Sequence, residues 1–186
     1  MLINHEREKL VEAVVFFAAN VRKLGKTKLF KLLYFLDFEH YRDTGRPVTG
    51  LEYFAWPMGP VPKALQNELE APPEDWQGRV SFSKIDTAKG GPMLAVKALG
   101  NFDPKHFSKR ELKLLQRLAE EYKNADADSM VDATHLENLP WHEVYEVRKA
   151  KQQLIPYELA LRKQDTAEIQ GQATSRAEFI STFMQG

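Results

Sequence analysis

Residues 26–44 constrain the fold more than any other segment, because they predict a helix that is apolar around almost its whole circumference. Gly25 ends the segment before it, and Gly45 and Pro47 break the helix after it. A helix of this kind must be surrounded by other elements. We therefore expect it to lie at the centre of the molecule.

Phe35 is the unusual residue of this helix. At about 100° per residue it lies in the middle of a narrow sector of charged side chains, which we expect to face solvent. Either another part of the domain covers Phe35 while the charged side chains reach around its edge, or Phe35 is a partly exposed anchor for a partner. The four residues of the charged sector are Lys28, Lys31, Glu39 and Arg42.

The first half of the chain otherwise predicts one more long helix and a short extended segment. Residues 4–24 form an amphipathic helix, and residues 51–56 are aromatic-rich and form a strand or an extended segment. We expect residues 57–62 to be irregular, because their prolines lack a hydrogen-bond donor. Residues 63–70 follow as a helix that starts after Pro62.

The second half predicts a hairpin followed by short helices. Residues 80–86 and 93–99 flank a Gly-Gly-Pro turn, and Ser108 with Glu111 forms a capping box that opens a helix. The fold class is therefore mainly α: a compact helical domain around a central apolar helix, with a small β-hairpin or short antiparallel sheet. Further short helices are expected over residues 128–135, from 140, and over 156–163.

We expect this domain to cover residues 1–163 and a polar tail to cover residues 164–186. In the tail, residues 175–184 carry an N-cap candidate and an apolar set, so they should form a short helix that docks on the domain or orders on a partner. A frayed terminus is the alternative.

Composition narrows the class of protein. The 186 residues include no cysteine, which excludes disulfides, iron–sulfur sites, cysteine-rich zinc sites and a thiol nucleophile. The N-terminus lacks the layout of a signal peptide, and no apolar run approaches the ~18 residues of a membrane span. We therefore expect a cytoplasmic protein with no membrane partner. The 26 basic and 26 acidic residues cancel, which does not favour general nucleic-acid binding.

Enzyme motifs are missing from the sequence. His142-Glu143 begins like a zinc-protease helix but lacks the second histidine, and neither a phosphate loop nor a Gly-x-Ser-x-Gly elbow occurs. We expect Asp37 to be a hydrogen-bonded carboxylate that braces a neighbouring loop. We predict no catalytic residue, no cofactor and no metal site, although a metal-dependent hydrolase would use the candidate ligands Asp37, Glu39, His40, His135, His142 and Glu143.

Several segments together resemble the Panacea domain, also called the SocA-like antitoxin domain of bacteria and phages. They are KLFKLLYF at 28–35, TGRP at 44–47, YFAWPMGPV at 53–61, and Thr134-His135 followed by Pro140-Trp141. The resemblance covers roughly residues 10–148. It implies an antitoxin that neutralises a protein toxin by direct binding, and for some members delivery of the toxin to a Clp-type protease. It brings no catalytic residues.

The motif residues include side chains that often anchor protein interfaces. The Met58-Gly59-Pro60 loop is stiff and is expected at the surface, whereas Trp141 is of a residue type that is usually buried. These aromatic residues also have a packing explanation, in which they seal the small sheet against the central helix. The candidate partner-binding residues are Phe35, Tyr53, Trp56, Met58, Gly59, Pro60, His135 and Trp141.

DNA binding is the alternative function. The first two helices and the turn at Gly25 have the order of a helix-turn-helix, and a basic cluster surrounds the turn. The polar face of the second helix is narrow for a recognition helix, so a transcriptional regulator is not favoured. The predicted basic patch consists of Arg22, Lys23, Lys26, Lys28 and Lys31.

Overall fold

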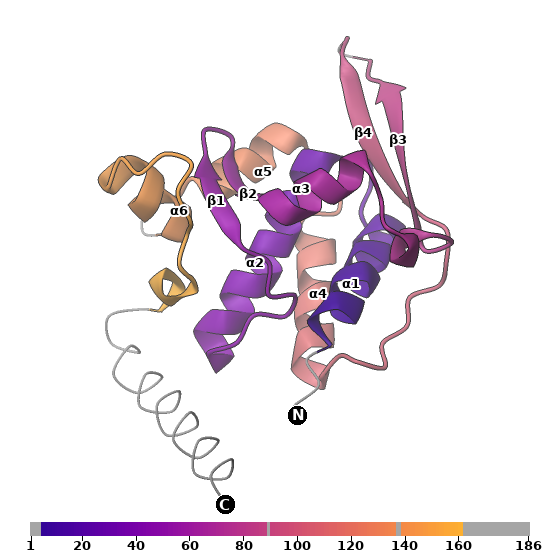
Figure 1. Ribbon diagram of the computed structural model, residues 1–186, viewed down its shortest axis with the longest axis horizontal. Coiled ribbons are helices and arrows are strands. Elements are labelled where there is room, and N and C mark those ends of the chain that lie inside the picture. Colours follow the sequence, from indigo (N-terminus) through magenta and orange to yellow (C-terminus); the bar gives the residue numbers. More distant parts are fainter. Residues whose placement is uncertain (1–4, 89, 137–138, 162–186) are drawn as a thin grey trace, which may run out of the picture.

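The computed structural model describes residues 5–88, 90–136 and 139–161. Helix α2 (Lys26–Thr44) runs through the middle of the molecule, with α1 (Glu6–Asn20) and α4 (Lys109–Glu121) beside it (Figure 1). This arrangement confirms the mainly α fold around a central apolar helix, with small antiparallel sheets.

Helix α2 is buried on nearly all sides, as its composition predicts. It ends at Gly45, whose φ of 71° lies in the left-handed region that favours glycine. The predicted solvent-exposed stripe is wrong for its N-terminal half, because Lys28 and Lys31 are 4% and 1% exposed. Other segments cover both lysines, and their ammonium groups bind backbone carbonyls. Glu39 and Arg42 remain partly exposed.

Helix α1 is shorter than the predicted 4–24. It ends at Asn20; Val21 is extended, and Lys23 has a φ of 48°. The apolar spacing continues to Leu24, which is also buried, but Leu24 reaches the core from the turn between the helices. Periodicity alone therefore overestimated the length of the helix. Residue 4, where this helix was predicted to begin, lies outside the described residues.

Strands β1 (Tyr53–Trp56) and β2 (Gly59–Pro62) form a short antiparallel hairpin, so the prediction that 57–62 is irregular is wrong. Pro60 and Pro62 face Ala55 and Tyr53 across the ladder. The backbone groups of Ala55 and Tyr53 bond on the opposite side, to residues 152–155, so the prolines occupy positions that donate no hydrogen bond to β1.

The second hairpin is confirmed. Strands β3 (Val80–Asp86) and β4 (Pro92–Ala98) pair in register and project from the helices (Figure 1). Its base is attached where Val96 N donates to Leu24 O. The elements α3 (Lys63–Glu70) and the 3-10 turn η1 (Glu74–Trp76) lie between the two hairpins in the sequence.

The C-terminal part of the fold consists of short helices, close to the predicted positions. The capping box at Ser108 and Glu111 is confirmed and opens α4. A membrane-spanning helix, which must be long and apolar, does not occur within the described ranges. The predicted tail, 164–186, lies outside them. The remaining elements are α5 (Ala127–Thr134), α6 (Pro140–His142), the π-helical turn η2 (Glu143–Val147) and the 3-10 turn η3 (Tyr157–Ala160).

Candidate functional site

Most of the predicted partner-binding residues lie on segments that contact one another: the β1–β2 hairpin, the C-terminal end of α5, and α6. Met58, in the hairpin turn, is 60% exposed, and Trp56 and His135 are partly exposed. Tyr53, Gly59, Pro60 and Trp141 are buried, so they support this surface from below. Phe35 is also buried and lies apart from them, against Tyr122 of the loop after α4.

Trp141 connects the three segments. Its indole Nε1 donates to the carbonyl of Trp56 at 2.9 Å, and its backbone N–H donates to the Tyr34 hydroxyl at 3.3 Å. The ring of His135 stacks on one face at 3.7 Å, and the ring of Tyr145 stacks at 4.7 Å. The hydrogen bonds and the stack fix the β1–β2 turn relative to α5 and α6.

Lys31 holds the same turn from inside the protein. Its Nζ donates to Pro60 O at 3.1 Å, and burial lowers its pKa to about 7. Gly59 has a φ of +101°, and a Cβ there would lie 2.6 Å from Lys31 Nζ and 2.8 Å from Thr134 Oγ1. Glycine is therefore needed at position 59 both for the backbone conformation and for the close approach of Lys31.

The His135 ring that stacks on Trp141 carries one nitrogen that makes no hydrogen bond within the described residues. Its Nε2 is buried and has no hydrogen-bond partner among the residues that the structure describes. Burial lowers the pKa of His135, and the positive charge of Lys31 lowers it further. The next residue, Leu136, is 62% exposed.

Exposed apolar side chains occur on or next to the segments that meet at the His135–Trp141–Tyr145 stack. Leu136 follows α5, Val147 ends η2, and Leu154 pairs with Phe54 at the outer edge of β1. Together with Met58 they are 43–62% exposed. We call this surface the Met58 face and define it as Met58, Leu136, Val147 and Leu154 around the stack. Leu136, Val147 and Leu154 could not be predicted as surface residues, because single apolar residues in short helices and turns show no period that separates surface from core.

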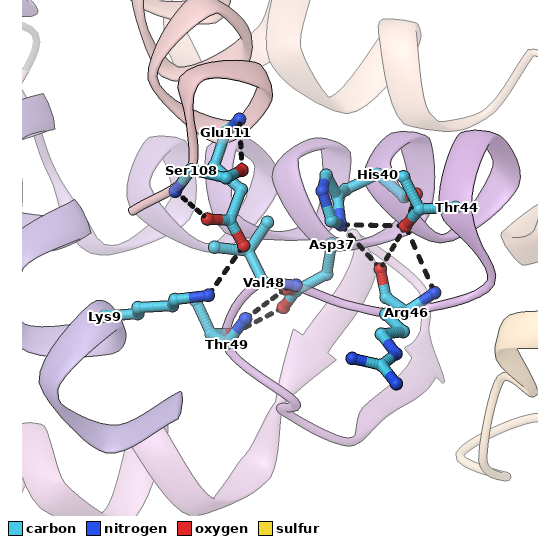
Figure 2. A network of polar contacts seen from close by, with 9 residues as sticks. All are labelled: Lys9, Asp37, His40, Thr44, Arg46, Val48, Thr49, Ser108 and Glu111. Carbon is cyan, nitrogen blue, oxygen red and sulfur yellow. Dashed lines mark hydrogen bonds and ion pairs between the residues drawn. The ribbon is translucent and has the colours of Figure 1, made fainter. Parts of the chain in front are cut away.

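Asp37 has the bracing role that its helical phase predicts. Its carboxylate accepts hydrogen bonds from the backbone N–H groups of Val48 and Thr49 (Figure 2). It also accepts from the Thr49 hydroxyl and the Tyr53 hydroxyl, and all four distances are 2.5–2.8 Å. Burial raises its pKa to about 6, and these hydrogen bonds oppose the rise. Because the donors occupy both oxygens, this carboxylate fixes the loop after α2.

The predicted basic patch is not one surface. Lys28 is buried, and its Nζ donates to the carbonyls of Arg22, Lys123 and Ala125, at distances of 2.6–3.4 Å. Lys31 is buried under the β1–β2 turn. The side chains that remain at least partly exposed are Arg22, Lys23 and Lys26.

The candidate metal ligands named from the sequence are not brought together. Asp37 binds the loop, Glu39 pairs with Arg117, and His40 Nδ1 lies 2.7 Å from Arg46 O (Figure 2). Within the described parts of the chain, the histidine and carboxylate side chains that do come together are His5, Glu8 and His106. This group could not be predicted from the sequence, since His106 lies about a hundred positions from His5 and Glu8 in the chain.

Comparison with family models gives a match over residues 29–142, described as the antitoxin SocA-like, Panacea domain. This chain belongs to that family. The matched range contains most of α2 and both hairpins. It also contains Trp141 and the residues that bond to it or stack on it, except Tyr145. The SocA-like family implies a protein partner and a regulatory role. No curated protein and no solved structure matches the chain.

Proposed function

We propose that this SocA-like protein is an antitoxin that neutralises a cognate protein toxin by binding it directly through the Met58 face, without catalysis. The observation that carries the proposal is the exposure of Met58, 60%, on a turn that Trp141 and Lys31 hold rigidly. Membership of the family supports a protein partner.

The physical character of the face suits protein binding. Methionine and large apolar side chains are enriched at the centres of interfaces, and their burial gives favourable free energy. A turn that is already ordered loses little conformational entropy on binding. The partly exposed ring of Tyr145 stacks on Trp141 and has Lys151 Nζ 5.5 Å from its centroid. It adds an aromatic and cationic rim.

The test is co-expression with the toxic product of a neighbouring gene. Wild-type protein should restore growth and co-purify with the toxin without nucleotide or metal. Met58→Asp should abolish both, because a carboxylate would be desolvated in the interface. Leu99→Asp is the matched control: Leu99 is 62% exposed but lies at the base of the β3–β4 hairpin.

Both variants should keep the wild-type melting temperature, since neither side chain is buried. Growth rescue by Met58→Asp at the wild-type level would refute the Met58 face as the binding surface. Rescue by the wild type without a physical complex would refute direct neutralisation.

We further propose that the protein delivers the toxin to a Clp-type protease. We also propose that the protein acts in the cytoplasm. The toxin's half-life would then shorten in cells that contain both antitoxin and protease, and would not shorten when the protease is deleted. We do not propose DNA binding, because Lys28 and Lys31, two of the five residues of the predicted basic patch, are buried.

A further inference from the structure

His5, Glu8 and His106 lie together where the start of α1 meets the loop before α4. His5 is the N-cap of α1 and Glu8 lies in its first turn, whereas His106 belongs to the loop before α4. One ligand atom from each lies within 4.8 Å of the others, and the two imidazole rings stack at 4.0 Å.

The scaffold around these side chains fixes the two segments to each other. The backbone N–H of Asp103 donates to Glu12 of α1 at 2.8 Å, and Lys9 Nζ donates to Glu111 of α4 at 2.7 Å (Figure 2). The ring of Phe102 packs against Phe16 at 5.0 Å. The loop that carries His106 is therefore attached to α1 on both sides of that residue.

Two imidazoles and one carboxylate form a donor set typical of zinc and related ions. Ligand bonds to Zn²⁺ are about 2.0–2.2 Å long, which puts the donor atoms of a tetrahedral site roughly 3.4 Å apart. His5 Nδ1 already lies 3.2 Å from Glu8 Oε1. The stacked rings of His5 and His106 must turn, because imidazole lone pairs lie in the ring plane and must point at a common ion. His5 and Glu8 are 37% and 50% exposed, which leaves them room to rotate.

Positive charges near the cluster do not oppose a cation, because each has its own carboxylate. Arg7 pairs with Asp75 and Glu68. The others are paired as Arg79 with Glu12 and Lys105 with Asp103.

We propose that His5, Glu8 and His106 bind a divalent transition-metal ion, Zn²⁺ in preference to Mg²⁺ or Ca²⁺, and that the ion ties the start of α1 to the loop before α4. Mg²⁺ and Ca²⁺ require mainly oxygen ligands, which this cluster does not supply. The proposal is independent of the Met58 face and of toxin binding.

The test uses the full chain without an affinity tag, titrated with ZnCl2 in a calorimeter at neutral pH. We expect one Zn²⁺ per chain and no heat of binding with MgCl2. His106→Ala and His5→Ala should each weaken binding by more than the roughly 10–100-fold that loss of an outer-shell partner costs. His142→Ala, a partly buried histidine on α6, is the control and should bind as the wild type does.

A second measurement does not depend on how the variants fold. Imidazole nitrogen and carbon-bound proton resonances of His5 and His106 should shift on addition of Zn²⁺, and those of His40 and His142 should not. Zn²⁺ should also raise the melting temperature of the wild type, and acidification should remove this rise by protonating the ligands. Zn²⁺ binding that leaves the His5 and His106 resonances unchanged, or no binding at all, would overturn the proposal.

Discussion

Phe35 packs face to face against Tyr122, with ring centroids 5.3 Å apart and planes inclined by 1°. The charged residues beside it are engaged in the fold: Lys28 binds backbone carbonyls, and Glu39 pairs with Arg117 of α4. They therefore do not form the polar rim of an exposed anchor. Of the two explanations of Phe35, burial by another part of the domain agrees with its 7% exposure.

Phe35→Ala should lower the free energy of unfolding by about 3–5 kcal/mol, because it leaves a cavity between α2 and Tyr122. Urea denaturation followed by circular dichroism measures this change. Leu99→Ala, at an exposed position, should change it by less than about 0.5 kcal/mol. A stable Phe35→Ala protein that no longer binds the proposed protein partner would instead make Phe35 an interface residue.

The sequence predicts the surroundings of some residues on α2 better than those of others. The position of Asp37 on the apolar side of a central helix was enough to predict a hydrogen-bonded brace, because an unpaired buried carboxylate is costly. The burial of Lys31 could not be predicted in the same way. It depends on Pro60 O and on Gly59, which lie close to Lys31 only in the folded protein.

Among the elements, the β1–β2 hairpin shows how a glycine is used for close packing. A Cβ at position 59 would meet Lys31 and Thr134. At Gly78, whose φ is +69°, a Cβ would meet no described atom within 4 Å apart from those of its chain neighbours. The two glycines therefore allow backbone strain and close approach to be measured separately.

Gly59→Ala should lower the free energy of unfolding more than Gly78→Ala does. The Gly78 variant should cost about 1–2 kcal/mol, from the left-handed backbone alone. The Gly59 variant should cost a further 1–3 kcal/mol, roughly, because the neighbouring side chains must move. Paired urea denaturation curves give the difference. Equal losses would show that the packing of Lys31 against Gly59 contributes little.

Elements with a local signal were predicted well. The capping box of α4 uses residues three positions apart, and both of its hydrogen bonds form, from Glu111 N to Ser108 Oγ and from Ser108 N to Glu111 Oε2. Strand β2 was missed because its proline positions are acceptable only in one register with β1, and the partner of β1's other edge is the distant segment 152–155. Such pairing is a property of the tertiary fold.

At the scale of the whole molecule, a buried lysine on the central helix makes stability depend on pH. Burial lowers the pKa of Lys31 from 10.5 to about 7. Between these values the unfolded chain holds the proton and the folded chain does not. The free energy of unfolding therefore rises with pH in this window, and it is constant in this respect below pH 7, where both states are protonated.

The expected contribution of Lys31 is about 1.4 kcal/mol per pH unit above neutrality. Lys31→Met keeps the aliphatic stem and removes the titrating group, so its unfolding free energy should rise less steeply with pH. Urea denaturation of both proteins across the window from about pH 7 to pH 9 measures the difference in slope. Lys28, whose pKa burial also lowers, is present in both proteins and cancels. Identical slopes would contradict the assignment to Lys31.

The hairpin beside the Met58 face has no edge at which another chain could add a strand. Residues 152–155 occupy the outer edge of β1, and the outer side of β2 carries Pro60 and Pro62, with Pro60 O already bound to Lys31. Strand addition, a common route both to peptide capture and to aggregation, is therefore blocked on both sides. Any partner at this face must be recognised through side chains. Such a surface can change its specificity by substitution while its backbone hydrogen bonds stay the same. A chain with no partner bound is also protected from pairing with copies of itself at this hairpin.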